Sequence, residues 1–516
     1  MVKILLWLLA CCAVLPVEGR QRVSIDESEL QGKCGTELFE TLRKWHSMAY
    51  TTGAELIYPE NMVLEVEIPA GVRDAIPLSP YTDFNGCRMI VTNRAVRYFA
   101  LFSLSDRKKE KPVEIGCDMI NSGDYSSMPQ LNSGLKLLWI KDRNPWTRRA
   151  PEEGDYDIFR EDVVLIRDGK ALNRTIVGYD RKTSDPQCRY VETDDGQKVI
   201  CNLTFERSDD STEHTRLIHI YLQNNVLVRN VKVLTPYGAQ DTDDRRYRED
   251  YCIRVMNSAN VSFEDVEVRG TYSSAKTWGY AVNLENVYNC RFLRFDAEAH
   301  WGVFGNNNVN TATLTDCHVN RFDLHCYGRD FTCRGCVFNN QIDDLEPGQD
   351  YCQTNVLNAF ASMFGTLRFE DCRFVKSRPV YLRAYYKAYT GFDVVFGDCV
   401  FDLHPSFPYF VTAGLLDEAD GPRRELRGKC WPNITMRDCQ VNVPDGVREL
   451  YLFYALRNSR TISEIGHLST IEMDGVVMNS SQPIRLKGSN VNARLKKRLK
   501  KQVWGNGFRI DTSMLR

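Results

Sequence analysis

The sequence predicts an all-β fold, a single-stranded right-handed parallel β-helix with an N-terminal capping helix and loop excursions. From about residue 217 the chain repeats short alternating apolar runs that bend at an Asn, Asp or Gly, a pattern typical of strands at solenoid spacing. A single coil cannot bury its own apolar face, so we expect the coils to stack in parallel, roughly 4.8 Å apart, around one core. The repeats are NNVLVRNVKV, ANVSFEDVEV, NTATLTDCHV, GRDFTCRGCVF, GTLRFEDCRF, FDVVFGDCVF and PNITMRDCQV.

The length supports one elongated domain. The chain has 516 residues, more than one ordinary core, yet no Pro/Gly/Ser-rich linker divides it after its N-terminus. We therefore expect a single β-helix domain over residues 20–516.

Residues 1–19 are expected to be a cleaved signal peptide. Lys3 precedes an apolar stretch over residues 4–14 that is too short to span a bilayer. The segment LLAC resembles a bacterial lipobox that would acylate Cys11, but Leu and Ala are ordinary in such a stretch, so simple cleavage is favoured. No other segment has the roughly 18 apolar residues of a membrane helix. We expect an exported protein that is periplasmic, extracellular or at the cell surface.

The charge balance excludes one class of partner. Basic and acidic residues number 66 and 68, for a formal charge of −2, which argues against a general nucleic-acid binder. The basic run RLKKRLKK over residues 494–501 could touch an anionic polymer but is more typical of a solvated helix face.

The 18 cysteines suggest disulfides in an exported chain, but several recur at one position of the repeat. Such residues should stack in a column, where Cys acts as a small apolar side chain. Oxidation between neighbouring columns stays open. The recurring residues are Cys317, Cys336, Cys372, Cys399 and Cys439.

The other elements follow in chain order. Residues 36–48 form an amphipathic pattern that predicts a helix capping the open end of the core, within a cap over about residues 30–50. Residues 55–69 and 86–93 are predicted first strands. Residues 142–179 are polar and are expected to be a loop excursion with a strand at 163–167. Weaker repeats over about residues 449–516 are expected to close the other end.

Alternation predicts one polar outer face. In RFDLHCY, Phe322, Leu324 and Cys326 should point inward, which leaves Arg321, Asp323, His325 and Tyr327 outside. An offset of 21 residues to the preceding coil turns Trp301, Val303 and Gly305 inward and His300, Phe304 and Asn306 outward. Tyr280, Val282 and Leu284 are expected in the core. The same rule places Arg254, Asn283, Glu285, Tyr381, Arg383, Tyr385 and Lys387 outside.

Four segments carry a resemblance to a known superfamily. They are NPWTRR at 144–149, GTYSS at 270–274, HWGVFG at 300–305 and NRFDLHCYGRD at 320–330. The chain resembles the pectin-lyase-like right-handed β-helix superfamily, and more closely a group of Bacteroidetes-type secreted β-helix proteins. That superfamily includes lyases, glycoside hydrolases, methylesterases and non-catalytic adhesins, so the resemblance implies a fold and a carbohydrate polymer rather than one reaction.

The outer face favours β-elimination on a uronate-containing polysaccharide. Such a lyase needs a cation for the carboxylate and a base for the neighbouring proton. Arg321 or Arg383 could bind the carboxylate, and His325 or Tyr327 could take the proton. Asp323 could orient the imidazole or bind a hydroxyl. The expected substrate-binding residues are His300, Phe304, Arg254, Asn283, Arg383, Tyr385 and Lys387.

Two alternatives stay open. A glycoside hydrolase needs two carboxyl groups about 5 to 9.5 Å apart; Glu285 and Asp323, placed four residues apart across the strands, are too distant. Hydrolysis would recruit the loop acids Asp241, Asp243, Asp244, Asp343 or Asp344. A non-catalytic glycan-binding or adhesin solenoid would use the same face without a poised base.

No clear metal motif is present, and the cofactor is left unknown. The acidic loops could offer oxygen ligands to Ca²⁺, but Arg245 and Arg246 indicate a solvated charged loop. A monomer is the default expectation.

Overall fold

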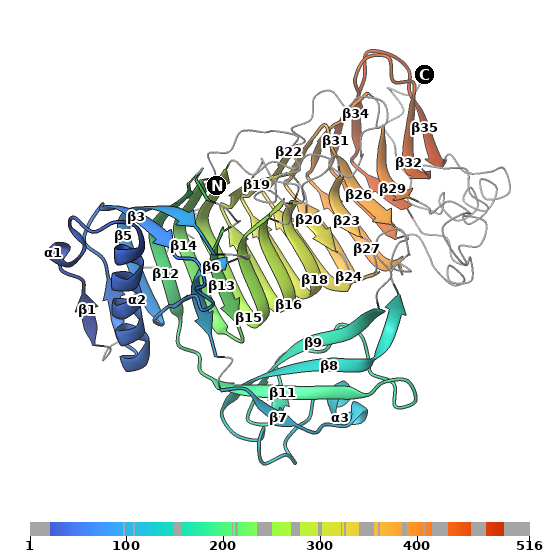
Figure 1. Ribbon diagram of the computed structural model, residues 1–516. Coiled ribbons are helices and arrows are strands. Elements are labelled where there is room, and N and C mark those ends of the chain that lie inside the picture. The colour runs from blue at the N-terminus through green and yellow to red at the C-terminus, as the bar shows by residue number, and fades with distance from the viewer. Residues whose placement is uncertain are drawn as a thin grey trace, which may run out of the picture.

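The computed structural model is a parallel solenoid that runs from an N-terminal helix to strand β35 (Figure 1). It is a right-handed parallel β-helix, as the sequence predicts. The structure describes residues 21–516 except 96–98, 107–108, 149–156, 209, 212–214, 235–249, 270–278, 298–301, 321, 325–326, 340–354, 360–361, 384–389, 406–407, 415–431, 456–470 and 490–516. The predicted signal peptide and the last part of the predicted closure lie outside these residues.

The strands stack in three parallel ladders, and each coil from β16 onward contributes to all three in turn. The first ladder contains β4 (Ile76–Pro77), β6 (Phe99–Ser105), β13 (Thr215–Tyr221), the first parts of β15 (Asp250–Arg269), β16 (Gly279–Leu293) and β18 (Gly302–Thr315), then β20 (Phe322–Leu324), β23 (Asn355–Ala359), β26 (Arg378–Arg383), β29 (Tyr409–Gly414), β32 (Glu449–Ala455) and β35 (Arg485–Ser489).

The second ladder continues each coil after a corner. It contains β3 (Val63–Ile68), β5 (Tyr81–Asn93), β12 (Lys198–Arg207), β14 (Asn224–Leu234), the later parts of β15, β16 and β18, then β21 (Tyr327–Arg334), β24 (Ser362–Glu370), β27 (Thr390–Gly397), β30 (Asn433–Arg437) and β33 (Ile471–Asp474). The short strands β1 (Arg22–Ser24) and β2 (Glu55–Ile57) extend the start of β5.

The third ladder is made of short strands that follow a bend. It contains β17 (Asp296–Ala297), β19 (His318–Val319), β22 (Val337–Asn339), β25 (Arg373–Val375), β28 (Val400–Asp402), β31 (Gln440–Asn442) and β34 (Val477–Asn479).

The bend before the third ladder needs a left-handed backbone in coil after coil. Asp316, Asp371, Asp398 and Asp438 have φ between 51° and 53°, a region that Asp tolerates better than most residues. Gly335 takes this place in one coil, and a Cβ there would lie 2.4 Å from Oδ1 of Asp316. The Asn, Asp and Gly bend signals of the sequence are thus confirmed.

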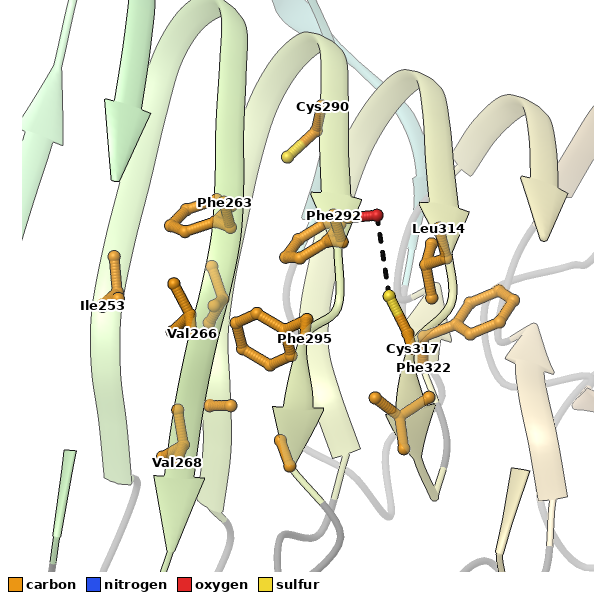
Figure 2. Close-up of a cluster of buried hydrophobic side chains, with 14 of the residues drawn as sticks. Ile253, Phe263, Val266, Val268, Cys290, Phe292, Phe295, Leu314, Cys317 and Phe322 are labelled. Atoms are coloured by element: carbon orange, nitrogen blue, oxygen red, sulfur yellow. Dashed lines mark hydrogen bonds between the residues drawn. The ribbon is translucent and has the colours of Figure 1, made fainter. Parts of the chain in front are cut away.

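Stacked aromatic rings fill the core. Phe263 lies on Phe292 with ring centroids 5.0 Å apart, and Phe374 lies on Phe401 at 4.8 Å. Figure 2 shows the first pair with Phe295 and the surrounding aliphatic side chains. Burial of each such ring stabilises the fold by roughly 1.5 to 3 kcal/mol.

The predicted cysteine column is confirmed. Its members are buried free thiols, and each Sγ lies within hydrogen-bond range of the carbonyl oxygen two residues earlier. Cys317 also reaches the carbonyl oxygen of Phe292 in the coil before, at 3.6 Å (Figure 2). The column therefore packs as small side chains with their thiol protons directed to backbone oxygens.

The predicted capping helix is present as α2 (Gly35–Thr52), which follows the short helix α1 (Glu27–Leu30). Leu38, Phe39 and Leu42 share its buried face and pack on the first coil. Gly53 ends the helix with φ 68°, and its N–H bonds the carbonyl oxygen of Tyr50. Among the described residues, no helix is long and apolar enough to cross a membrane.

The excursion predicted over residues 142–179 leaves the solenoid and includes the strand expected at 163–167, but the prediction that it is otherwise a loop is wrong. The chain leaves the solenoid after β6 and forms a five-stranded antiparallel sheet with strand order β10-β9-β8-β11-β7. We call this unit the subdomain. Its elements are β7 (Lys111–Val113), α3 (Cys117–Ser122), β8 (Leu135–Arg148), β9 (Asp157–Arg167), β10 (Lys170–Ala171) and β11 (Pro186–Thr193).

The subdomain has a core of its own and a second face that packs on the solenoid. Val164 and Ile166 of β9 lie in its internal core. Val163 and Leu165, on the other face of β9, pack with Leu222 and Ala259 of the solenoid. Figure 1 shows the sheet beside the strands β15 to β18. Apolar burial on both faces of β9 thus holds the subdomain against the corner between the first and second ladders.

Candidate functional site

One polar position recurs on consecutive coils of the first ladder. The backbone register pairs His219 with Arg254, Arg254 with Asn283, Asn283 with Gly305, and Gly305 with Asp323. We call these five residues the outer column. The residues on either side of His219, Arg254, Asn283 and Asp323 point into the core; they are Ile218, Ile220, Ile253, Val255, Val282, Leu284, Phe322 and Leu324.

Arg254 is held by an acid in the neighbouring coil. Its Nη2 atom donates to both carboxylate oxygens of Glu285 at 2.9 Å. Both side chains are partly buried, with 28% and 18% of their surface exposed. Partial exclusion of water strengthens the ion pair between the guanidinium and the carboxylate. The pair holds the guanidinium in one position beside Asn283.

Asp323 stands in the predicted column but is not exposed. Its side chain is completely buried, and Oδ2 accepts a hydrogen bond of 2.6 Å from the hydroxyl of Tyr280. Tyr280 is buried, with 5% exposure, as predicted. A buried carboxylate requires donors, and the phenol supplies one. The hydrogen bond links this coil to the strand β16 that bears Tyr280.

The prediction that Tyr327 shares a face with Asp323 is wrong. The chain turns a corner between them, so Tyr327 begins β21 in the second ladder while Asp323 lies in β20. Tyr327 is fully buried. Its hydroxyl donates to the carbonyl oxygen of Glu161 at 2.8 Å and accepts from the N–H of the same residue. Tyr327 therefore fastens the subdomain and cannot act as a base at the outer column.

The predicted register around Phe304 is wrong by three residues. An offset of 21 would set Asp323 beside Gly302, but Asp323 pairs with Gly305. An odd slip exchanges the two faces of a strand. In the backbone register Phe304 accordingly pairs with the core residue Val282, and Gly305, predicted inward, belongs to the outer column.

Several predicted site residues fall outside what the structure describes. These are His300, Arg321, His325, Tyr385 and Lys387, together with the loop acids Asp241, Asp243, Asp244, Asp343 and Asp344. Arg383 is described as backbone at the end of β26, where it pairs with Gly414. Two residues earlier, Tyr381 pairs with Asn358, which pairs with Asp323, so the column continues along the backbone.

His219 is the outer-column residue that the sequence prediction omitted. It lies between Ser103 and Arg254 in neighbouring coils, and its ring centroid is 5.9 Å from that of Tyr221. The segment LIHIY carries the same alternation as the later coils, so Ile218 and Ile220 in the core already imply an outward His219. Applying the alternation rule one coil earlier would have found it.

The subdomain is bonded along the corner next to this column. Glu161 accepts from the side-chain amide of Asn286 at 2.8 Å and from Lys141 at 2.6 Å. Arg329 donates to the carbonyl oxygen of Ile176 at 2.8 Å. These contacts span several coils, so the subdomain forms a fixed border of the outer face.

Asp162 lies within this docked region and is fully buried. Burial raises its pKa to about 7, against opposing hydrogen bonds from the Ile176 N–H and the Tyr179 hydroxyl and the nearby charge of Arg329. The subdomain thus contains a carboxyl group whose protonation changes around pH 7.

Within the described ranges, no group of three or more His, Cys, Asp or Glu side chains is placed to hold a metal ion. The acidic loops that suggested Ca²⁺ lie outside those ranges. The described part of the site consists of hydrogen-bonding and ionisable side chains.

Comparison with known proteins supports the fold. No protein-family model matches the sequence, and no curated protein matches it. Among solved structures, the tailspike protein gp49 from Pseudomonas phage LKA1 matches with a TM-score of 0.50 and 11% identity, over 88% of this chain and 71% of that chain. The Gp54 tailspike of Acinetobacter baumannii bacteriophage AP22, solved in complex with capsular saccharide, matches with a TM-score of 0.44 and 10% identity over 91% and 77%.

A Family 28 exopolygalacturonase from Yersinia enterocolitica matches with a TM-score of 0.30 and 8% identity, over 95% of this chain and 79% of that chain. The gp49 match, at a TM-score of 0.50 and 11% identity, supports the fold alone. The parallel β-helix that the resemblance implies is confirmed.

Proposed function

We propose that this chain is an exported carbohydrate-active protein that binds an acidic polysaccharide along the outer column and cleaves it by β-elimination. The observation that carries the proposal is the direct pairing of His219, Arg254 and Asn283 on consecutive coils. Export rests on the predicted signal peptide. Neighbouring coils lie roughly 4.8 Å apart, so the column is a linear array of polar groups suited to a linear polymer.

Each of these residues would have a different role in the reaction. Arg254 and Asn283 would bind the uronate carboxylate and stabilise the negative charge that spreads onto it. His219 would take the proton from the carbon that bears this carboxylate. The electron pair forms a double bond to the next ring carbon, whose bond to the glycosidic oxygen breaks, and the departing oxygen receives a proton from a general acid or water.

Glu285 has a definite part in this arrangement. Its two contacts orient Arg254 before substrate arrives, which lowers the entropy that must be lost on binding. A uronate carboxylate would approach the remaining donors of the guanidinium.

Hydrolysis is the second candidate, and the corrected register favours it more than the sequence did. Glu285 lies two residues past the outer column and pairs with Asn307, whereas Asp323 lies in that column. Glu285 is therefore two coils and two residues from Asp323, about 12 Å between α-carbons. If both carboxylates lean toward each other, they approach the 6.5 to 9.5 Å of inverting enzymes.

The deciding experiment incubates the purified protein with polygalacturonate, alginate and neutral dextran. It follows new reducing ends and the ultraviolet absorbance of unsaturated uronates. Both signals together support β-elimination. Reducing ends without absorbance indicate hydrolysis at Glu285 and Asp323. Binding without either signal favours a glycan-binding solenoid. A protein that neither binds nor cleaves any of these polymers would contradict the proposed function.

A further inference from the structure

We infer that Trp146 is a sugar-stacking platform that the subdomain places beside the outer column. The inference rests on the proposed function and assigns a role to the NPWTRR segment. Trp146 lies near the end of β8, which crosses to the solenoid. Its ring contacts the ring of Tyr327, with centroids 5.1 Å apart and planes at 88°. Two segments singled out in the sequence, NPWTRR and NRFDLHCYGRD, thus meet in space.

A buried carboxylate fixes the turn that precedes Trp146. Asp142 is completely buried. Its Oδ1 accepts from the N–H groups of Asn144 at 3.0 Å and Asp185 at 2.8 Å, and Oδ2 accepts from Arg160 at 3.1 Å. Because these donors come from separate segments, the turn cannot move without breaking a buried network.

The pairing of β8 with β9 is irregular just before Trp146 and at Trp146 itself. The register shifts between Lys141 and Pro145 and again between Pro145 and Thr147. Bulges of this kind redirect a side chain out of the regular alternation of a strand. Here they accompany a tryptophan that lies on the solenoid corner instead of in the internal core of the subdomain.

Tyr327 sets the level of Trp146 along the solenoid. Asp323 and Tyr327 belong to the same coil, in β20 and β21, so Trp146 lies at the coil that bears the Asp323 carboxylate. The Tyr327 ring is immobile because its hydroxyl bonds Glu161. Trp146 itself is only partly buried.

A rigid, partly exposed indole at the border of a polar column matches a pyranose ring. The flat C–H face of a sugar packs on an aromatic ring while its equatorial hydroxyls reach polar groups at the side. Asn144, exposed two residues earlier, is one such group. A side chain that served only to dock the subdomain would instead be expected fully buried, as Tyr327 is.

Affinity electrophoresis and tryptophan fluorescence with polygalacturonate and alginate test this inference. Trp146→Ala should weaken binding about tenfold or more, and Trp146→Phe should retain most of it because a flat ring remains. Leu172→Ala removes an exposed apolar side chain, 48% accessible, from the same subdomain and should bind like wild type. Thermal unfolding of each variant reports whether the subdomain stays folded.

The outcomes separate this inference from the proposed function. If wild-type protein binds and Trp146→Ala binds equally well, the platform is overturned while the proposed function stands. If Trp146→Ala and Trp146→Phe weaken binding equally and both unfold at lower temperature, Trp146 has only a structural role. If wild-type protein binds neither polymer, both proposals fail.

Discussion

His46 is a neutral imidazole sealed inside the N-terminal cap. It is fully buried among Tyr58, Phe84 and Phe102, with Nε2 2.6 Å from the Tyr58 hydroxyl. Burial lowers its pKa from 6.5 to about 3, against a smaller opposing effect of the Pro77 backbone. The folded state therefore excludes a proton that the unfolded chain accepts.

We expect His46 to make the fold sensitive to acid. As pH falls from 6.5 to about 3, the unfolded chain binds a proton at His46 and the folded chain does not, so stability declines by up to about 1.4 kcal/mol per pH unit. His46→Gln, which cannot become charged, should show a shallower decline in denaturant unfolding measured across this range. Parallel pH profiles for the two proteins would contradict the assignment.

Turnover should depend on His219 more than binding does. His219→Gln keeps a polar side chain but removes the base, and we expect a loss of 10²- to 10⁴-fold in kcat with little change in KM. The comparison is His325→Gln, which tests the base predicted from the sequence. If only the His325 variant loses turnover, the base is His325 and not His219.

Single residues also show where the sequence was sufficient. Arg254, Asn283 and Asp323 were placed on one outward face because alternation between core residues fixes the face of a strand, whereas their alignment in one column was not predicted. Phe304 was misplaced because the offset between coils depends on the length of the intervening turn, which no local pattern records. Tyr327 was misplaced because the strand was extended through a corner.

Among the elements, β9 shows how far the sequence predicted the subdomain. Its segment VVLI is continuously apolar because one face is buried by the internal core and the other by the solenoid, and it lies within the strand predicted at residues 163–167. The rest of residues 142–179 was predicted as a loop because it is polar and lacks an apolar alternation. The helix α2 presents the opposite case, since its apolar residues share one face and its range was predicted closely.

The docked subdomain should respond to pH through Asp162. Its pKa of about 7 exceeds the ordinary value of 3.8, so the folded chain holds a proton that the unfolded chain has lost. Stability is complete below the ordinary value and falls as pH rises toward 7. Asp162→Asn removes this loss and keeps groups that can bond Ile176 and Tyr179.

The measurement is the difference in unfolding free energy between Asp162→Asn and wild type. It should increase by up to about 1.4 kcal/mol per pH unit between pH 4 and 7 and level off above that range. Wild type and Asp162→Asn both keep Arg329 and Glu161, so the contribution of these nearby charges is the same in the two proteins. A difference that is independent of pH would show that Asp162 is ionised throughout.

At the scale of the whole molecule, one column of thiols runs through successive coils without oxidation. Denaturation without reductant should let iodoacetamide label Cys317, Cys336, Cys372, Cys399 and Cys439, as peptide mass spectrometry can show. In the folded protein the same thiols should resist labelling because they are buried. Labelling that requires a reductant would mean that the column is oxidised.

The global architecture was the most predictable feature, because each coil repeats the same strand and bend chemistry and errors in one coil do not propagate. The corners are different. Their length varies from coil to coil, and the site depends on which residues those corners bring level with one another.

One corner has a practical consequence. The subdomain leaves the solenoid after Ser105 and returns at Lys198, between β6 and β12, whereas the next coil crosses the same corner between Tyr221 and Asn224. The whole subdomain therefore occupies a place that two residues fill elsewhere, and its entry and exit lie close together. The subdomain is therefore replaceable. Exchanging it for a short turn, or for another small sheet, would change the border of the outer face and leave the strands that carry the reacting groups in their present register.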